Sequence, residues 1–298
     1  MKSVCVIGGA GFLGSHVADA LSDYGYEVRV FDCVESPWLR KDQTMIVGDI
    51  LDLEALNKAI SGCEVVYNYA AISSLNEALY KPIDTIKINV LGNTNVMEAC
   101  RKNNVKRFIY ASTVYVYSRE GGFYRCSKQA AEHYVEGFHE AYGLNYTILR
   151  FGSIYGPRAD QSNGLFCIAK QALETGKIKY VGSPDSMREY IHVEDAARAS
   201  VTVLNEEFCN QSIVLTGQEA MRVMDMLEML SEILGLKNAV EFVSDKQFGH
   251  YVRTPYAYQP RLGRKYVPQL HVDLGQGLLE LVRYIHNCEI SIEQRGIK

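Results

Sequence analysis

Short apolar runs alternate with amphipathic helical stretches through the first half of the chain. The apolar runs have the length of β-strands and lie at residues 3–8, 26–32, 44–49, 64–70, 105–112 and 145–151. Helical patterns follow them, beginning near residue 11, at 53–60, at 89–102 and in the stretch that carries Lys128. Strands that alternate with helices indicate an α/β fold, with a doubly wound parallel sheet covered by helices on both faces.

The pattern changes after residues 155–158. Helical stretches and short strands then mix, at 165–176, 177–182, 188–193 and 193–204, and amphipathic helices are predicted at 225–235 and 275–286. No low-complexity linker separates the two parts. We therefore predict a first domain, built on the parallel sheet, over residues 1–155, and a smaller C-terminal α/β lobe that binds substrate and makes up most of residues 156–298, although the chain can return to the sheet.

The composition is that of a globular protein. The 298 residues are 47% apolar and 22% charged, and the net charge of −4 argues against a general nucleic-acid or membrane-surface binder. The start of the chain predicts neither a signal peptide nor a membrane span. The cysteines have no metal-ligand spacing, so we expect no metal site, and reduced thiols in a cytoplasmic protein: Cys5, Cys33, Cys63, Cys100, Cys126, Cys167, Cys209 and Cys288.

Three glycines follow the first predicted strand directly and open a helix. Gly8, Gly11 and Gly14 are three residues apart. Glycine permits a tight turn, the approach of backbone to a pyrophosphate and close packing of helix on strand. The helix N-terminus then offers free N–H groups to the phosphates. This pattern makes the first part of the chain a Rossmann-type dinucleotide-binding domain.

Two acidic residues end the next two strands. Asp32 can accept hydrogen bonds from the adenosine ribose and would repel a 2′-phosphate, and no Arg or Lys occupies residues 33–37. The predicted cofactor is therefore NAD and not NADP. Asp49 could reach the adenine, although a plain loop carboxylate is an alternative for this residue.

A hydroxyl, a phenol and an amine lie close together in the stretch "ASTVYVYSREGGFYRCSK". Thr113 ends a predicted strand, and Tyr124 and Lys128 are four residues apart at the start of a helix, on one face of it. The ammonium of Lys128 is expected to favour the phenolate and lower the pKa of Tyr124, and to hold the nicotinamide ribose. Thr113 can position the same substrate oxygen. The three residues suit removal of a proton from a carbinol while hydride leaves for NAD.

A series of motifs resembles a known family. "GGAGFLG", "GDI", "YAA", "NVLGNTNVMEAC", "ASTVYVYS", "YRCSK", "RFGSIYGPR" and "REYIHVEDAARA" occur in the order seen in the extended short-chain dehydrogenases/reductases. The resemblance covers nearly the whole chain. It is closest to the NAD-dependent nucleotide-sugar epimerases and dehydratases, in particular the UDP-glucose 4-epimerase branch.

The resemblance implies roles for individual residues. Thr113, Tyr124 and Lys128 match the catalytic residues, and Arg188 matches an Arg that holds a nucleotide diphosphate, with Arg253 as its possible partner or a solvated loop charge. A homodimer is implied, paired through the helices near 89–102 and 124–141. The implied NAD contacts are Gly8, Gly11, Phe12, Leu13, Asp32, Asp49, Ile50, Ala70 and Ala71, besides Tyr124 and Lys128.

The chain departs from the family pattern in three places. Val114 and Tyr115 stand where dehydratases have Asp-Glu, which argues against water elimination. Ser153 stands where many members have an Asn that contacts the sugar, so the substrate is open. The connection between Thr113 and Tyr124 is shorter than in relatives, which suggests a more open site, an unusual sugar or a partner that supplies the cover.

The predicted function is NAD-dependent oxidation and reduction of a nucleotide-linked sugar, with C4 epimerisation through a keto intermediate as the leading reaction. A nucleotide-sugar 4-dehydrogenase that does not epimerise is the alternative. A nonenzymatic NAD-binding sensor or scaffold is the alternative from another class, and it would need none of Thr113, Tyr124 and Lys128.

Overall fold

The computed structural model describes residues 2–237, 239–243, 250–253 and 255. All of them belong to the first of two units of the chain, residues 1–259. The helix predicted at 275–286 and Cys288 lie outside the described residues. No helix in the described part has the length and apolar character needed to cross a lipid bilayer.

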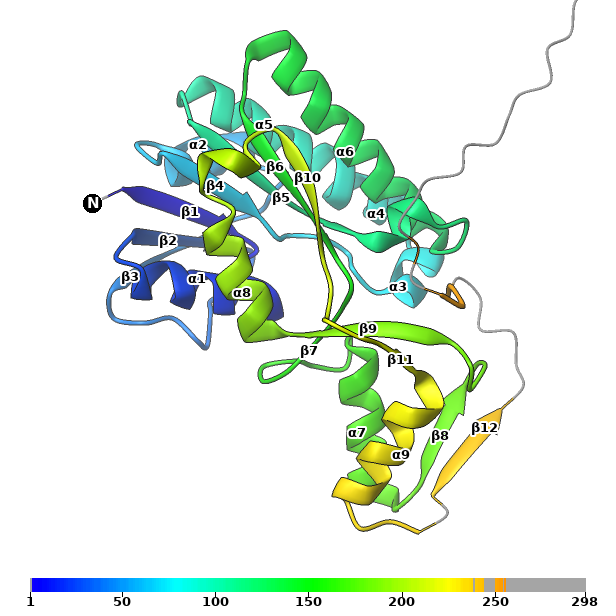
Figure 1. The fold of residues 1–298 in the computed structure, drawn as a ribbon. Helices are drawn as coiled ribbons and strands as arrows, with labels where there is room; N and C mark the ends of the chain where they lie inside the picture. The colour runs from blue at the N-terminus through cyan, green and yellow to red at the C-terminus, as the bar shows by residue number, and fades with distance from the viewer. Residues whose placement is uncertain (1, 238, 244–249, 254, 256–298) are drawn as a thin grey trace, which may run out of the picture. The chain divides into compact units, whose positions relative to one another are not determined.

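A sheet of seven parallel strands forms the centre of the larger part (Figure 1). Its order is β10–β6–β5–β4–β1–β2–β3. The strands are β1 (Ser3–Ile7), β2 (Glu27–Asp32), β3 (Gln43–Val47), β4 (Val65–Asn68), β5 (Arg107–Thr113), β6 (Tyr146–Phe151) and β10 (Gln211–Leu215). The predicted fold class, a doubly wound Rossmann-type sheet, is confirmed.

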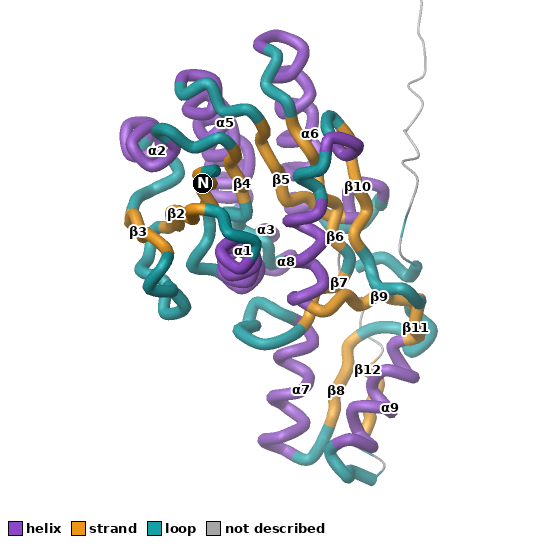
Figure 2. Tube along the Cα trace, turned by 60° about the vertical axis from the view of Figure 1, so that its left-hand side comes forward, coloured by secondary structure: helices purple, strands orange, loops and turns teal. Residues whose placement is uncertain are grey.

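Helices cover both faces of the sheet (Figure 2). One face packs against α2 (Leu53–Ile60), α5 (Asn93–Lys102) and α6 (Gly122–Tyr142), and the other against α1 (Phe12–Asp23) and α8 (Val193–Thr202). Strand β5 is therefore buried on both sides over nearly its whole length, as continuous apolar runs in a parallel sheet require. Shorter helices connect these elements: α3 (Leu75–Tyr80), α4 (Pro82–Ile86), the π-helix η1 (Lys87–Gly92), and the 3₁₀ turns η2 (Val114–Tyr117) and η3 (Glu206–Phe208).

The remaining elements form a smaller α/β lobe with its own apolar core. One small sheet has the order β11–β9–β7 and the other pairs β12 with β8. The elements are β7 (Ser153–Tyr155), α7 (Gly164–Thr175), β8 (Ile178–Val181), β9 (Met187–His192), β11 (Ala220–Arg222), α9 (Val223–Ile233) and β12 (Val240–Val243).

The chain crosses between the lobe and the large sheet more than once. After β9, α8 packs on α1, and β10 pairs with β6 in the large sheet. The hydroxyl of Tyr67 in β4, which is buried, donates to the carbonyl oxygen of Ser200 in α8 at 2.8 Å. Residues 193–215 therefore complete the nucleotide-binding part, and the lobe is built from the segments on either side of them.

A buried ion pair joins helix α6 to strand β6. The guanidinium of Arg150 contacts the Glu132 carboxylate through Nε at 3.0 Å and Nη2 at 2.6 Å, and Ser112 Oγ donates to the same carboxylate at 2.5 Å. The side chains of Glu132 and Arg150 are 8% and 16% exposed. This pair fixes the helix that carries Tyr124 and Lys128 against the sheet.

We expect Arg150→Met to lower the free energy of unfolding by about 3 kcal/mol, because the Glu132 carboxylate would stay buried without its cation. The double variant Arg150→Met/Glu132→Met should recover much of this loss, since the unpaired charge is removed as well. Chemical denaturation of the two variants measures both values. A double variant that is no more stable than Arg150→Met would contradict the assignment of the loss to charge.

Candidate active site

The loop between β1 and α1 leaves no room for side chains. Gly8 has a φ of 78°, and a Cβ atom there would lie 2.4 Å from the backbone nitrogen of Ala70. A Cβ on Gly14 would lie 2.2 Å from the carbonyl oxygen of Gly8. Gly11 is the N-cap of α1 and supplies no capping side chain, so the first N–H groups of the helix remain for a ligand. This geometry fits a pyrophosphate, and Phe12 and Leu13 open the helix at that point.

Asp32 lies at the end of β2 and holds the glycine loop. Its Oδ2 accepts a hydrogen bond from the backbone of Ala10 at 3.0 Å, and its Oδ1 accepts one from Val34 at 3.4 Å. Asp49 accepts from the backbone of Leu51 at 2.9 Å, which makes it a turn-forming carboxylate. The Ile50 side chain is buried in the core, so only its backbone remains to contact a dinucleotide.

A chain of hydrogen bonds leads from the end of β4 to the helix α6. Ala70 and Ala71 follow β4, and Ala70 is the residue that Gly8 approaches. Asn89 in the π-helix η1 accepts from Ile72 N at 2.8 Å, donates to Ile72 O at 3.0 Å and donates to Ser127 Oγ at 2.9 Å. Ser127 in turn donates to the carbonyl oxygen of Tyr124 at 2.8 Å. The glycine loop and the predicted catalytic helix are therefore joined through buried polar groups.

Our sequence analysis missed Asn89. The signal was present, because Asn89 and Asn93 are four residues apart in an otherwise apolar helical pattern, and both are buried. Asn93 accepts a hydrogen bond from Asn68 at 2.8 Å, and Asn68 accepts one from Ala70 N at 3.1 Å. Buried amides at helical spacing need partners, so they indicate a polar network between elements.

Thr113, Tyr124 and Lys128 come together as predicted from their spacing. Thr113 is the last residue of β5, and its hydroxyl lies near enough to the Tyr124 phenol to act on the pKa of that phenol. The Lys128 ammonium is 4% exposed, donates to Ala111 O at 2.7 Å and lies 5.9 Å from the centre of the Tyr124 ring. Thr113 Oγ1 also accepts from Tyr115 N at 3.3 Å, so its own proton is free to be donated.

The expectation that Lys128 lowers the pKa of Tyr124 is wrong for this structure. Burial raises the pKa of Tyr124 to about 12, and the nearby Thr113 hydroxyl opposes the rise. Burial also lowers the pKa of Lys128 to about 7, which the nearby Glu132 partly counteracts. The sequence argument assumed a charged amine in a solvated setting, whereas a fully buried amine loses part of its charge near neutral pH.

The residues predicted to bind substrate lie in different settings. Arg188 in β9 is 7% exposed; its guanidinium stacks 4.6 Å above the ring of Tyr251 and donates to Met187 O at 2.9 Å. Ser153 begins β7 and pairs with Tyr190 of β9. Arg253 is exposed. Sequence analysis gave no warning that Tyr251 would stack on Arg188.

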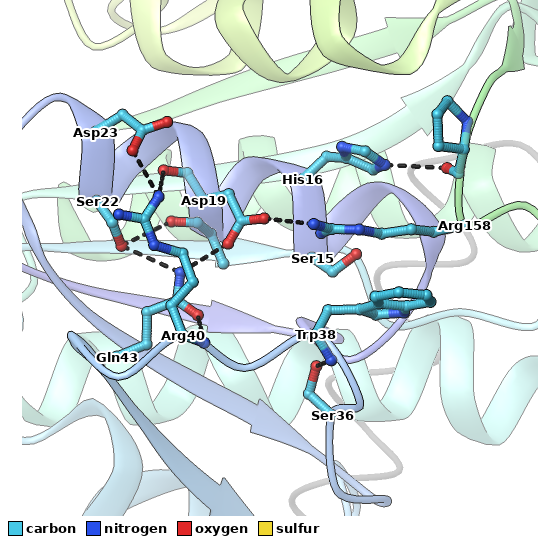
Figure 3. Close-up of polar contacts among 12 residues, drawn as sticks. Ser15, His16, Asp19, Ser22, Asp23, Ser36, Trp38, Arg40, Gln43 and Arg158 are labelled. Carbon is cyan, nitrogen blue, oxygen red and sulfur yellow. Dashed lines mark hydrogen bonds and ion pairs between the residues drawn. The ribbon is translucent and has the colours of Figure 1, made fainter.

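A second polar network ties α1 to the loop after β2 and to the segment after β7 (Figure 3). Arg158 forms an ion pair with Asp19 at 2.7 Å and lies 4.9 Å from the centre of a Trp38 ring. His16 Nε2 donates to Pro157 O at 3.0 Å, because a carbonyl can only accept. Arg158 adopts a φ of 65°, which is uncommon outside glycine. These contacts attach the segment after β7, which leads into the smaller lobe, to helix α1.

Among the described residues, no group of His, Cys, Asp and Glu side chains is placed to hold a metal ion. The residues that gather at the carboxyl edge of the sheet are instead backbone donors, a carboxylate, a phenol, an amine and a hydroxyl. They fit a dinucleotide and an acid/base reaction.

Comparison with known proteins agrees with this site. The model of the NAD dependent epimerase/dehydratase family matches residues 4–215. A Methanocaldococcus jannaschii protein named as a putative UDP-glucose 4-epimerase is 26% identical over 95% of this chain and 98% of its own length. A UDP-N-acetyl-alpha-D-glucosaminuronate decarboxylase of Bacillus cytotoxicus is also 26% identical, over 97% of this chain and 99% of its own.

Solved structures agree with the fold as well. The Thermotoga maritima UDP-glucose 4-epimerase with UDP-glucose has a TM-score of 0.79 and 27% identity, and the match covers 86% of this chain and 90% of that one. The Thermus thermophilus UDP-glucose 4-epimerase in complex with NAD has a TM-score of 0.77 and 26% identity, with 88% and 95% covered. The resemblance inferred from the motifs is confirmed.

The lowered pKa of Lys128 makes a prediction about stability. Below pH 7 the amine is charged in both the folded and the unfolded chain, and the folded state bears the full cost of burying that charge. Between pH 7 and the ordinary value of 10.5 the unfolded chain binds more protons, so the cost falls as pH rises. The unfolding free energy of the wild type should therefore rise relative to that of Lys128→Met between pH 7 and pH 10.5.

Thermal or chemical unfolding of both proteins between pH 6 and pH 10.5 measures this shift. Lys41→Met, at an exposed lysine, is the matched control and should show no such trend. A flat difference for Lys128→Met across the range would mean that the amine stays charged in the folded protein.

Proposed function

Because the chain belongs to the NAD-dependent epimerase/dehydratase family, we propose that it catalyses C4 epimerisation of a nucleotide-linked sugar through a keto intermediate. The observation that carries the proposal is that the hydroxyl of Thr113 and the phenol of Tyr124 lie together next to the buried amine of Lys128. A protein that only bound NAD would have no use for this arrangement.

In the proposed mechanism, Tyr124 acts as the phenolate, which takes the proton from the sugar carbinol and later returns it. Burial disfavours the phenolate, and the positive ring of an oxidised nicotinamide, when bound, would favour it. Thr113 accepts a hydrogen bond from the backbone of Tyr115 and so directs its own proton toward the same oxygen. Lys128, which donates a hydrogen bond to Ala111 O, would hold the nicotinamide ribose. NAD, when bound, supplies the acceptor for the hydride and the means of returning it. The protein would exclude water from much of the reacting groups, because Lys128 is buried and Tyr124 is half-buried.

The cofactor would be held by the elements described for the glycine loop. The free N–H groups at the start of α1 would bind the pyrophosphate, and Asp32 would face the adenosine ribose. Asp49, Ile50, Ala70 and Ala71 would complete the contacts, Ile50 through its backbone. Val114 and Tyr115 supply neither the acid nor the base that dehydration needs, so elimination of water is not proposed.

Arg188 is the proposed ligand of the nucleotide diphosphate, since its planar guanidinium is already oriented by the Tyr251 ring. Ser153 would face the sugar, and Arg253 would approach the nucleotide from the exposed end of the same segment. The homodimer and the cytoplasmic location stay predictions. The exposed side chains of Leu91 on η1 and Tyr134 on α6 are compatible with pairing through these helices.

Tyr124→Phe removes one oxygen and leaves the packing nearly unchanged. We expect the variant to fold and to bind NAD, but to lose at least about a hundredfold in turnover, the usual scale for a positioned acid/base. Tyr134→Phe, at an exposed residue of the same helix, is the control and should keep full activity.

Turnover is followed by the absorbance of reduced nicotinamide and, separately, by the configuration of the sugar in NMR spectra. Inversion at C4 without net NADH indicates an epimerase, whereas stoichiometric NADH with a keto sugar indicates the 4-dehydrogenase. If the wild type turns over a nucleotide sugar and Tyr124→Phe matches its rate, the mechanism is refuted.

The charge of Asp32 should set the preference for NAD. Asp32→Asn keeps an oxygen for the hydrogen bond from Ala10 but removes the charge, so it should narrow the gap between NAD and NADP affinity by about tenfold or more. Calorimetric titration of both dinucleotides measures the gap. Asp42→Asn, which removes a surface carboxylate paired with Arg40, is the control. A wild type that binds NADP more tightly than NAD would contradict the argument.

A further inference from the structure

The short connection between Thr113 and Tyr124 places an aromatic side chain next to the proposed catalytic residues. Residues 114–117 form the 3₁₀ turn η2, which places Tyr115 beside Tyr124 with their ring centres 6.3 Å apart and the rings nearly perpendicular. Gly121 has a φ of 98°, and a Cβ there would lie 2.8 Å from the Tyr115 ring. The tight turn with glycine is therefore what lets the ring fit.

Tyr115 also contacts a segment that is distant in sequence. Its hydroxyl is 2.9 Å from Nδ1 of His250, and its ring centre is 4.7 Å from that of Tyr251. The segment is held in place by a hydrogen bond from Met187 N to Val252 O at 2.7 Å. The guanidinium of Arg188 stacks on the ring of Tyr251. The side chains of Tyr115, Tyr251 and Arg188 therefore form a continuous row.

The row runs from the proposed acid/base to the proposed diphosphate ligand. Its members in order are Tyr124, Tyr115, Tyr251 and Arg188, with successive separations of 6.3, 4.7 and 4.6 Å. A nucleotide sugar that reaches from Arg188 to Tyr124 must lie along it. The sugar is the part next to Tyr124, so Tyr115 is the side chain that it meets.

The side chains of Tyr115 and His250 are uncharged near neutral pH. Burial and the positive charge of Arg188 lower the pKa of His250 to about 4, so the imidazole stays neutral. Burial raises the pKa of Tyr115, so it stays a phenol. Of the charged groups facing this segment in the described part of the chain, Arg188 is committed to the stack on Tyr251, and Lys128 to the carbonyl of Ala111.

We propose that Tyr115, held by His250, contacts the sugar and restricts the substrates to nucleotide-linked sugars that carry no charge, so that hexoses are accepted and hexuronates are rejected. This inference rests on the proposed function. It assigns a specificity-determining role to Tyr115.

The physical basis is the cost of burying an unpaired carboxylate. A hydroxyl held by Tyr124 and Thr113 lies about 3 Å from their oxygens. The carbons next to the reacting one then come within contact of the Tyr115 ring, which can cover the apolar face of a sugar. A carboxylate in that place would lose its water and meet an aromatic ring, a phenol already bonded to His250 and a neutral imidazole.

The test compares substrates that differ only at carbon 6. The kcat/KM of the wild type is measured for glucose and glucuronate, each as the uridine diphosphate and the thymidine diphosphate form. We expect a preference for the glucose form of at least about a hundredfold. Tyr115→Phe, which keeps the ring, should retain this preference within about threefold, whereas Tyr115→Ser, which admits water, should reduce it by about tenfold or more.

The outcomes separate this inference from the proposed function. A wild type that prefers the glucuronate overturns the inference and leaves the proposed function standing, whereas no turnover of any sugar by an NAD-bound protein overturns both. If Tyr115→Ser lowers kcat/KM for both sugars by the same factor, Tyr115 has only a structural role and the inference is wrong. Tyr115→Asn, which also replaces the ring with a small polar side chain, provides the same comparison if Tyr115→Ser fails to fold.

Discussion

The arrangement of the site depends on one buried side-chain amide, that of Asn89, which needs hydrogen-bond partners. Asn89 sits in a π-helical turn, where its side chain bonds both backbone groups of Ile72 and the hydroxyl of Ser127. A buried amide that lost these partners would carry a large desolvation cost, so the three elements are held in one arrangement. The loop that approaches Gly8 and the helix that carries Tyr124 are thereby joined on one side of the sheet.

Burial determines the electrostatics of the proposed catalytic groups more than pairing does. It raises the pKa of Tyr124 to about 12 and lowers that of Lys128 to about 7. The two shifts move apart two pKa values that are ordinarily close to each other, so near neutral pH the phenol keeps its proton while the amine loses part of its charge. The Glu132 carboxylate, four residues beyond Lys128 on α6, favours the charged amine, but it is bound by Arg150 and so acts weakly.

The smaller lobe contributes to the site through a few side chains. Arg188 comes from β9, and His250 and Tyr251 come from a segment hydrogen-bonded next to the start of that strand. Tyr115 meets them from the nucleotide-binding part. This contact between distant segments places His250 and Tyr251 beside the short connection between Thr113 and Tyr124.

The sequence by itself determined the sheet, the glycine loop and the identity of the proposed catalytic residues. Strand and helix periodicity are local properties, and the spacing of Tyr124 and Lys128 places them on one helical face whatever surrounds them. The tertiary structure alone decided the direction of the pKa shift of Tyr124, because desolvation depends on every element packed around the phenol. It also decided the partners of Arg188 and Tyr115, since no local pattern relates positions 115 and 188 to residues 250 and 251.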